Sequence, residues 1–352
     1  MEERVLMKGN EALAEGAIRA GCRAFFGYPI TPSSELAEYM ARTMPKIGGV
    51  FVQAESELAA INMVYGGAST GARVMTASSG PGLSLKQEGI SFIAEGELPC
   101  LIVNLSRGGP GLGGIQPSQA DYFQATRGGG HGDYRTLVLA PSGVQEMMDL
   151  AMEGYDLADR YRTPVLIMAE GTLGQMMEPI ILREPVTQFV DKPWATTGCV
   201  GRKPNVVNTL HLDPEFLEKR NRHLDAKYKE IQANEQRAET FMMEDADLAV
   251  MAFGIIARIA KRSVMEARKQ GIKVGLIRPI TLWPFPERVV AGAARKVRRF
   301  LSIEVSMGQM VEDIRLAVNG QVPVDFYGRI GITPNPEELT REIMRIAERE
   351  GF

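Results

Sequence analysis

Cysteine is scarce in this chain of 352 residues, and its scarcity excludes several kinds of protein. The three cysteines, Cys22, Cys100 and Cys199, lie far apart in the sequence and form no CxxC pair. This spacing argues against a disulfide framework and against a zinc or iron–sulfur site on this chain, so we expect it to bind no metal. Scattered thiols are typical of a reducing compartment, and we expect a cytoplasmic protein.

An excess of positive charge and long apolar runs are also missing. Lysine and arginine number 40 against 43 acidic residues, which gives a net charge of -3 at pH 7. This balance creates no positive field for nucleic acid, so we expect no nucleic-acid partner. The apolar runs have the length of strands, well short of the roughly 18–20 residues of a membrane span. The N-terminal sequence MEERVLMKGNEALAEG mixes charges and lacks the apolar core of a signal peptide.

Short apolar strands alternate with helices along most of the chain. In the first half, the pattern predicts strands at residues 24–27, 50–53, 73–77, 99–105, 136–140 and 164–168. Such alternation indicates an α/β fold with helices on both faces of a mostly parallel sheet. A second series of strands and helices follows in the last third of the chain. We therefore predict two doubly wound, mostly parallel-sheet domains, residues 1–180 and 245–352, joined by a linker with a charged helix, residues 181–244.

A strongly charged stretch, which begins in this linker, runs from Pro214 to Asp247 and is predicted to be largely helical. Its apolar residues are too sparse for an ordinary amphipathic helix, so we expect it to bridge the domains or to lie across a partner. His211 precedes this segment and His223 lies within it. We interpret both histidines as surface residues.

Several candidate site residues follow directly after predicted strands, where α/β sheets bind their ligands. Glu55 and Glu57 end the strand at 50–53 and precede an apolar helix. A carboxylate at the mouth of a buried helix is costly unless something pairs with it. Two residues apart in an extended chain, both acids face the same way, so spacing does not choose between them.

Three loops with glycine or proline complete the candidate region. The turn at residues 28–34, YPITPSS, is either a helix-capping connector or a rigid ligand-binding loop. The turn at 78–82, SSGPG, has neither the GxGxxG nor the Walker pattern, so close packing explains it better than phosphate binding. Arg107 opens a glycine-rich loop and is either a surface arginine or a clamp for an anion. His131, in a second glycine run, is a proton carrier or, more often in such turns, a hydrogen-bonded loop residue.

Taken together, the motifs resemble the alpha subunit of the 2-oxoacid:ferredoxin oxidoreductases. The resemblance rests on YPITPSSE, QAESELAAINMVYGGA, TASSGPGLSLKQE, NLSRGGPG, GLIRPITLWPFP and IEVSMGQMVEDIR, in this order. These enzymes use thiamine diphosphate to convert a 2-oxoacid and coenzyme A into acyl-CoA, carbon dioxide and reduced ferredoxin. The resemblance implies a pyrimidine-binding domain at residues 8–180 and a transketolase C-terminal-like domain at 245–352. INMVYG, SSGPGLSLKQEGISF and GGGHGDYR are most similar to the branched-chain type, which acts on 3-methyl-2-oxobutanoate.

The resemblance also implies roles for individual residues. Glu57 matches the acid that hydrogen-bonds the aminopyrimidine ring of the cofactor and activates it, which makes Glu55 the weaker candidate. Thr31 and Arg107 match the residues that bind the substrate carboxylate. The prolyl turn that holds Thr31 also supplies Tyr28 and Pro29, which are expected to contact the cofactor.

Further partners are implied by motifs that this chain lacks. Thiamine enzymes hold the diphosphate and its metal through a GDG…N motif, and no GDG occurs here. The resemblance therefore implies a beta subunit that carries the diphosphate, magnesium and an iron–sulfur cluster, with gamma and delta-type ferredoxin-like subunits. We expect the assembly to be doubled around a two-fold axis and to reduce ferredoxin. Two alternatives stay open: the same subunit acting on 2-oxoglutarate, pyruvate or an aryl pyruvate, and a non-catalytic scaffold with a thiamine-enzyme fold.

Overall fold

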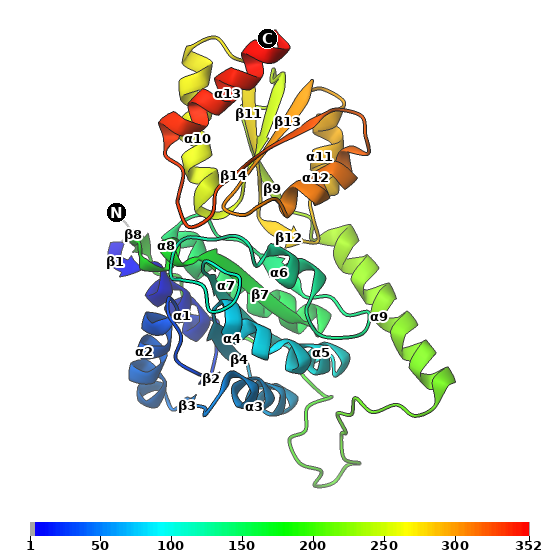
Figure 1. Cartoon of the computed structure of the whole chain (residues 1–352). Helices are drawn as coiled ribbons and strands as arrows, with labels where there is room; N and C mark the ends of the chain where they lie inside the picture. Colours follow the sequence, from blue (N-terminus) through cyan, green and yellow to red (C-terminus); the bar gives the residue numbers. More distant parts are fainter. Residues whose placement is uncertain (1–3, 352) are drawn as a thin grey trace.

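The computed structural model describes residues 4–351. It contains two α/β units, one above the other in Figure 1, with the C-terminal unit at the top. The first is built on a seven-stranded sheet and the second on a five-stranded sheet, and a separate two-stranded sheet lies beside the first unit. The predicted fold class is confirmed. Within residues 4–351, no helix has both the length and the apolar character needed to cross a membrane.

The seven-stranded sheet has the order β12-β6-β7-β5-β4-β2-β3. All neighbours pair in parallel except β12, which is antiparallel to β6. Its strands are β2 (Ala24–Gly27), β3 (Val50–Gln53), β4 (Val74–Ser78), β5 (Cys100–Ser106), β6 (Leu137–Leu139), β7 (Pro164–Glu170) and β12 (Thr281–Trp283). Every residue of β4, β5 and β7 is buried, as expected for central strands that are covered on both faces.

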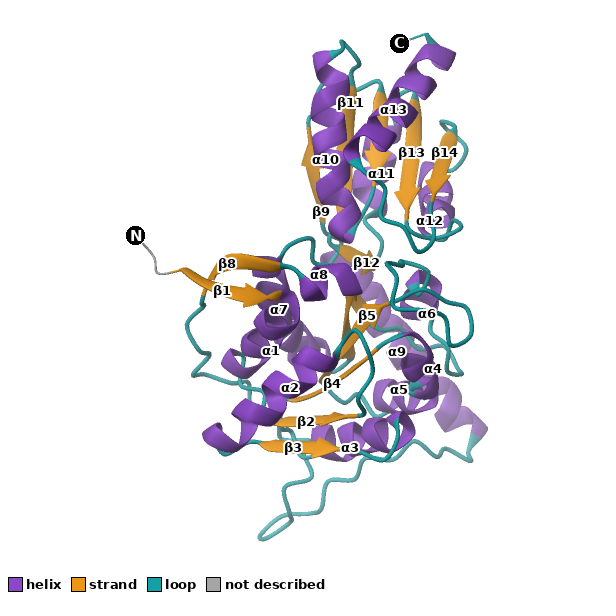
Figure 2. Ribbon diagram, turned by 60° about the vertical axis from the view of Figure 1, so that its left-hand side comes forward, coloured by secondary structure: helices purple, strands orange, loops and turns teal. Residues whose placement is uncertain are grey.

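Helices cover both faces of this sheet. They are α1 (Gly9–Arg19), α2 (Ser34–Thr43), α3 (Glu57–Ser69), α4 (Gly80–Leu85), α5 (Gln87–Glu95), α6 (Tyr122–Arg127), α7 (Val144–Tyr161) and α8 (Gly171–Gln175), with a 3-10 turn at Met44–Ile47. Helix α1 packs against α7, and α3 packs against α5. Figure 2 shows α1 and α7 on one side of the sheet and α5 on the other. This is the doubly wound arrangement that the alternation of strands and helices predicts.

The second unit repeats the same architecture on a smaller scale. Its sheet has the order β14-β13-β10-β11-β9, and only β9 is antiparallel to its neighbour. Its elements are β9 (Ala238–Phe241), β10 (Leu248–Met251), α10 (Gly254–Lys269), β11 (Val274–Pro279), α11 (Glu287–Ala294), β13 (Arg299–Glu304), α12 (Met310–Val318), β14 (Val324–Gly328) and α13 (Pro336–Glu350). Helices α10 and α13 pack together on one side and α11 and α12 on the other (Figure 1).

Three short strands differ from the sequence interpretation. Strand β12 belongs to the sheet of the first unit, although its sequence lies within the stretch assigned to the second domain. Strand β1 (Arg4–Lys8) pairs with β8 (Met177–Ile181) in the two-stranded sheet. Strand β9 lies where the charged segment was expected to stay largely helical. These three strands and β8 have three to five residues each, and β1, β8 and β9 are mostly exposed or half-buried, so no alternation of apolar residues marks them.

The charged segment forms helix α9 (Pro214–Asn234), which extends from the first unit towards the second in Figure 1. Its buried residues are Leu224, Tyr228 and Ile231, and the Tyr228 ring meets the Trp283 ring edge-on at 5.9 Å between centroids. The helix is therefore packed against the first unit through a narrow apolar stripe. The interpretation of His211 as a surface residue is wrong, because its side chain is only 12% exposed and its Nε2 lies 2.9 Å from Glu95 Oε1.

The two units meet at the carboxyl ends of their strands. Glu170, the last residue of β7, is buried, and its carboxylate accepts hydrogen bonds from Gln119 Nε2 at 2.5 Å and from the Ile255 N–H at 3.3 Å. Gln119 also donates to the Phe253 carbonyl and accepts from the Val305 N–H, both at 3.0 Å. No hydrogen bond described for residues 4–351 links the loops after β2, β3 and β4 to the second unit. That part of the sheet edge stays open.

Candidate functional site

The candidate site lies at the carboxyl edge of the seven-stranded sheet. Strands β5, β4, β2 and β3 are parallel neighbours, so the loops that follow them meet at this edge. These loops are the prolyl turn at 28–33, the acidic turn at 54–56, the glycine turn at 79–82 and the loop opened by Arg107. Carboxyl edges of parallel sheets are where α/β proteins bind ligands. The four segments singled out from the sequence are therefore brought to one place.

Glu57 is the first residue of α3, and its side chain is directed inward. The residue is 6% exposed, whereas Glu55 is exposed. The preceding Ser56 caps the helix, because its Oγ accepts a hydrogen bond from the Ala59 N–H at 3.1 Å. A helix N-terminus also favours a negative charge in its first turn. Burial thus separates the two acids that the sequence spacing left equivalent.

The carboxylate of Glu57 lies against the glycine turn. A Cβ added to Gly82 would be 2.4 Å from Ser78 Oγ and 2.5 Å from Glu57 Oε1, so only glycine fits between them. This is the close packing that the SSGPG sequence predicts. The hydroxyls of Ser78 and Ser79 are buried without a hydrogen-bond partner, and among residues 4–351 no donor is described for the Glu57 carboxylate. The two serine hydroxyls of this turn therefore lack hydrogen bonds, which is unusual for buried polar atoms in a folded protein.

Arg107 is fixed beside this turn rather than free in solvent. The residue is 9% exposed; its Nη1 donates to the Thr31 carbonyl at 2.8 Å and its Nη2 to the Leu112 carbonyl at 3.1 Å. Its Nε is buried and has no acceptor. A guanidinium has five N–H donors in a rigid fork, so two bonds to carbonyls orient the group without exhausting it. The arrangement suits a carboxylate, which can accept two parallel hydrogen bonds.

Thr31 is joined to Arg107 through its backbone. Its carbonyl receives the Arg107 hydrogen bond, and its own residue is exposed at the edge of the site. Tyr28 and Pro29, earlier in the same turn, are also exposed. The turn is anchored from below by Asn10, whose Nδ2 donates to the Pro32 carbonyl at 2.9 Å. The structure therefore brings Thr31 to Arg107, while Tyr28 and Pro29 have no described contact with Glu57.

Two ionisable residues near the site, the buried Lys86 and the half-buried Asp121, were not predicted. Lys86 is fully buried, and its Nζ donates to Thr76 Oγ1 at 2.6 Å. Burial lowers the pKa of Lys86 to about 8, while the charge of Glu57 opposes that fall. Burial also raises the pKa of Asp121, which accepts a hydrogen bond from Asn104 Nδ2 at 3.0 Å. The sequence contained two signals for these residues. They are Lys86 itself, in the apolar stretch after SSGPG, and Asn104, the partner of Asp121, in the apolar strand PCLIVNL.

His131 lies in a different place. Its Nδ1 is 3.5 Å from Ser91 Oγ, and its ring meets the Phe92 ring edge-on at 6.0 Å between centroids. It lines a cavity between α5 and α9 of about 160 Å³. Among residues 4–351 no contact of His131 with Glu57 or Arg107 is described, so it occupies the position of a hydrogen-bonded loop residue.

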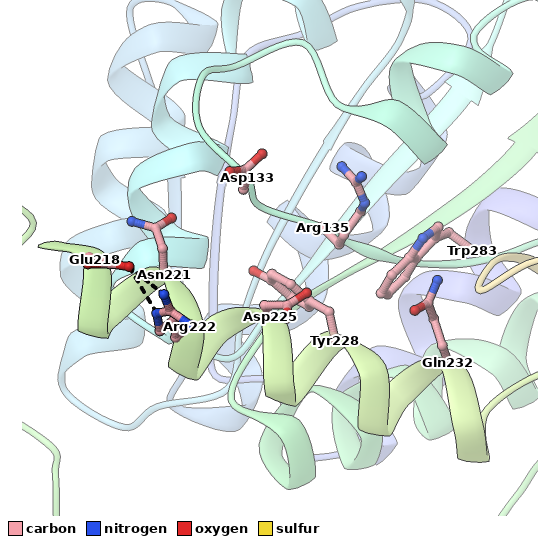
Figure 3. A pocket seen from close by; sticks show the side chains of 9 residues that line it. All are labelled: Asp133, Arg135, Glu218, Asn221, Arg222, Asp225, Tyr228, Gln232 and Trp283. Carbon is pink, nitrogen blue, oxygen red and sulfur yellow. Dashed lines mark hydrogen bonds and ion pairs between the residues drawn. The ribbon is translucent and has the colours of Figure 1, made fainter.

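A larger cavity of about 460 Å³ lies beside α9, and Figure 3 shows its walls. Helix α9 supplies one wall, which includes the exposed pair Glu218 and Arg222, 2.5 Å apart. Asp133, Arg135 and Trp283 lie across from this helix. None of the four site loops lines the cavity, so we do not assign the chemistry to it.

Two family descriptions match this chain. Residues 15–244 match "Pyruvate flavodoxin/ferredoxin oxidoreductase, thiamine diP-bdg", and residues 246–339 match "Pyruvate:ferredoxin oxidoreductase core domain II". The first match spans more than half of the chain and contains all four site loops. It names thiamine diphosphate as the ligand of the domain that holds Glu57.

Curated relatives agree with these matches. The chain is 51% identical over 347 residues to ketoisovalerate oxidoreductase subunit VorB of Methanothermobacter marburgensis, with 98% of each chain covered. It is 38% identical to 2-oxoglutarate synthase subunit KorA of Archaeoglobus fulgidus, with 96% of this chain and 97% of the relative covered. Both relatives are named as subunits.

Solved structures show the same fold. A 2-oxoglutarate:ferredoxin oxidoreductase from Magnetococcus marinus superposes with a TM-score of 0.87 at 26% identity; the match covers 98% of this chain but only 65% of the solved chain. A split-gene transketolase superposes with a TM-score of 0.60 at 11% identity over 96% and 97% of the two chains, a likeness of fold alone. Sequence motifs, family matches and fold agree: the chain belongs to the pyruvate flavodoxin/ferredoxin oxidoreductase family and is a subunit of a thiamine diphosphate-dependent 2-oxoacid:ferredoxin oxidoreductase.

Proposed function

We propose that this chain supplies the pyrimidine-activating half of the thiamine diphosphate site in an enzyme that oxidises a branched-chain 2-oxoacid. The observation that carries the proposal is Glu57, which is 6% exposed at the start of α3 and lies beside the buried, unpartnered hydroxyl of Ser78. A polar group buried without a partner costs free energy unless a ligand completes its hydrogen bonds. A ring nitrogen of the cofactor is the partner that we propose for Glu57.

The residues around Glu57 fit a planar polar ring. The buried hydroxyls of Ser78 and Ser79 have no partners, and Gly82 leaves the carboxylate accessible from the glycine turn. When bound, thiamine diphosphate supplies the electron sink that allows a 2-oxoacid to lose carbon dioxide. Glu57 would hold a proton at the ring nitrogen and so favour the tautomer of the aminopyrimidine that acts as a base. Tyr28 and Pro29 would contact the cofactor from the edge of the prolyl turn.

Arg107 and Thr31 would bind the substrate carboxylate. Arg107 is held by two backbone carbonyls and keeps further N–H donors for an anion. Because the carboxylate leaves as carbon dioxide, the ion pair with Arg107 exists before the reaction and is lost with it. Binding energy from this pair therefore orients the 2-oxoacid for attack rather than stabilising the product.

A branched aliphatic substrate suits the composition of these loops. Arg107 is the only cation in the sequences of the four loops, residues 28–33, 54–56, 79–82 and 106–116. A site for 2-oxoglutarate would need a second cation for the distal carboxylate. The side-chain pocket that we propose is instead formed by Tyr28, Ile30 and Leu112, the last placed by its bond to Arg107. The identity of 51% to a ketoisovalerate oxidoreductase subunit, against 36–38% to 2-oxoglutarate synthase subunits, supports the same choice.

The other half of the site would come from another chain. Leu112 is 81% exposed, Leu85 56% and Leu58 47%, and all three lie on segments that border the open edge of the sheet. We propose that this edge faces a beta subunit that carries the diphosphate, magnesium and an iron–sulfur cluster. Gamma and delta-type subunits, coenzyme A and ferredoxin complete the proposed enzyme, doubled around a two-fold axis. The free cysteines Cys22, Cys100 and Cys199 support a cytoplasmic location.

The domain limits also remain a proposal. We propose a pyrimidine-binding domain at residues 1–180, a linker at 181–244 and a transketolase C-terminal-like domain at 245–352. The family matches, which change at residues 244–246, support the second boundary. Strand β12 is the exception, because it lies in the C-terminal sequence and completes the sheet of the first unit.

The substrate proposal is tested on the assembled complex with a viologen dye as the electron acceptor. The kcat/KM is measured for 3-methyl-2-oxobutanoate, 2-oxoglutarate, pyruvate and an aryl pyruvate, with coenzyme A present. We expect the highest value for 3-methyl-2-oxobutanoate and at least a tenfold lower value for 2-oxoglutarate, since Arg107 alone serves one carboxylate. A higher kcat/KM for 2-oxoglutarate would refute the substrate assignment.

A further inference from the structure

Lys86 is a fully buried lysine directly behind the candidate site. It follows the last residue of α4 and precedes the first residue of α5, and it is among the largest fully buried side chains of the chain. Its ammonium donates one described hydrogen bond, to Thr76 Oγ1 at 2.6 Å. An ammonium has three donors, and burying one is unfavourable unless hydrogen bonds and an opposite charge compensate it. The single neutral hydroxyl of Thr76 does not supply that charge.

The geometry places this ammonium beneath the glycine turn. Thr76 and Ser78 are two residues apart on β4, so their side chains lie on the same face of the sheet, separated by roughly 7 Å. Ser78 Oγ and Glu57 Oε1 both lie within 2.5 Å of the position that a Cβ of Gly82 would occupy. Lys86 is hydrogen-bonded to Thr76, whereas the carboxylate of Glu57 lies beside Ser78. The ammonium is therefore two residues further from the carboxyl end of β4 than the carboxylate. Both charged side chains are buried on the same side of β4.

Glu57 is the only charged group found to act on the pKa of Lys86 within residues 4–351. It raises this pKa, so the carboxylate of Glu57 stabilises the ammonium of Lys86. The described hydrogen-bond partner of the ammonium, Thr76 on β4, is neutral. In the interior of a protein a charge pair is screened far less than at the surface, so its effect is felt over several ångströms.

We propose that Lys86 is a positioning residue for the cofactor: its buried ammonium balances the charge of Glu57 from behind the glycine turn and holds that carboxylate in place for the pyrimidine ring. This inference rests on the proposed function of Glu57. Lys86 itself does not touch the ring; it acts through Glu57. Removing the ammonium leaves the carboxylate of Glu57 without this counter-charge, and the carboxylate then turns away from the ring.

The test is a double-mutant cycle on the assembled complex, with the dissociation constant of thiamine diphosphate as the measured quantity. Lys86→Met removes the charge and keeps an unbranched side chain of similar length. It is measured in the wild-type and in the Glu57→Gln background at pH 7. We expect at least tenfold weaker cofactor binding in the wild-type background and less than a threefold change in the Glu57→Gln background. An equal loss in both backgrounds would show a merely structural role and overturn the proposal.

The pH dependence of cofactor binding supplies a readout that a structural role does not move. Burial lowers the pKa of Lys86 to about 8, so the ammonium is lost as the pH rises through that value. Cofactor affinity of the wild-type complex should then fall above about pH 8, and this fall should be absent in Lys86→Met. The same fall in both proteins would contradict the inference.

The variants Thr76→Val and Glu57→Gln distinguish a failure of the inference on Lys86 from a failure of the proposed function of Glu57. If Lys86→Met does not fold, Thr76→Val removes only the hydrogen bond that holds the ammonium, and it should weaken cofactor binding in the wild-type background but not with Glu57→Gln. A Glu57→Gln complex with unchanged cofactor affinity and turnover would refute the role of Glu57. An effect of Glu57→Gln without coupling to Lys86 would refute the inference on Lys86 alone.

Discussion

Glu57 and Arg107 carry opposite charges at the same edge of one sheet, yet each is held in place by the backbone around it. Glu57 is placed by the start of α3 and by the glycine turn, and Arg107 by two carbonyl groups. Neither forms a salt bridge with any residue between 4 and 351. At the residue scale, the candidate site is thus a pair of oriented, opposite charges that are not paired with each other.

A substitution at Gly82 can test how closely the candidate site is packed. Gly82→Ala should lower turnover of the assembled complex at least tenfold, because the new Cβ would lie 2.4 Å from Ser78 Oγ and 2.5 Å from Glu57 Oε1 and would displace both side chains. Gly66→Ala, in α3, is the matched control: apart from its chain neighbours and the backbone of its own helix, no described atom lies within 4 Å of the Cβ it would add. It should preserve turnover and stabilise the helix by roughly 0.5–1 kcal/mol. Steady-state assays and thermal unfolding of both variants check this, and full activity of Gly82→Ala would contradict it.

The sequence predicted the strand-end position of Glu57 and Arg107 because the motifs follow recognisable apolar strands. It did not separate Glu57 from Glu55, since the choice depends on where α3 begins. It also missed Lys86, because a lysine in a helix is normally solvated and only the packing of α3, α5 and β4 buries it. Burial of single polar residues is a property of tertiary packing, which no local pattern contains.

At the scale of elements, Glu97 joins three side chains of α9 to the first unit, and Glu95 also pairs with one of them, Arg220. Glu97, at a left-handed φ of 49°, lies 2.7 Å from Arg220 and 3.0 Å from both His223 and Lys227. Burial opposes its charge, but Lys227 and Arg220 together lower the pKa of Glu97 to about 2. The helix has few buried apolar residues, so this ion cluster supplements a thin hydrophobic contact.

Glu97→Gln should therefore loosen α9 without unfolding the sheets. Among residues 4–351, Glu97 is the acid that contacts all three side chains, Arg220, His223 and Lys227, so amide hydrogen exchange across α9 should become at least tenfold faster without it. Glu218→Gln is the control, because its partner Arg222 is exposed and such surface pairs contribute about 0–1 kcal/mol. Hydrogen exchange read by mass spectrometry measures both. Unchanged exchange in Glu97→Gln would show that the apolar stripe alone holds the helix.

The long elements of this fold were predictable and the short ones were not. Apolar strands such as β5 and β7 are continuous runs that only a buried strand explains. Strand β12 has three residues between two prolines, and its partner β6 lies more than a hundred residues away in the sequence. Its place in the first sheet depends on how the two units pack, which the local sequence does not determine.

On the scale of the whole molecule, the junction between the two units contains a buried acid. Burial raises the pKa of Glu170 to about 7 from an ordinary value of 4.5, because the carboxyl group is enclosed between β7 and α10. An acid whose pKa is raised in the folded state makes its full contribution to the free energy of unfolding at pH values below its ordinary pKa. That contribution is lost as the pH rises through the folded value.

Glu170→Gln should accordingly flatten the dependence of stability on pH between about 5 and 8. The wild-type chain should lose up to roughly 3 kcal/mol of unfolding free energy over this range from Glu170 alone, as the shift implies. The amide stays neutral and should not show this loss. Glu244→Gln changes an exposed acid and serves as the control. Denaturant unfolding at several pH values measures the difference; parallel curves for wild type and Glu170→Gln would contradict the assignment.

The central claim concerns the whole assembly: this chain contributes the acid that activates a cofactor whose diphosphate is held elsewhere. The most direct test is turnover of the complex, reconstituted with its partner subunits, for Glu57→Gln and for Glu55→Gln. Glu57→Gln should lower kcat at least a hundredfold, within the range expected for losing a general acid–base group. The exposed Glu55→Gln should change kcat less than threefold. Unchanged turnover of Glu57→Gln in the assembled complex would contradict the account.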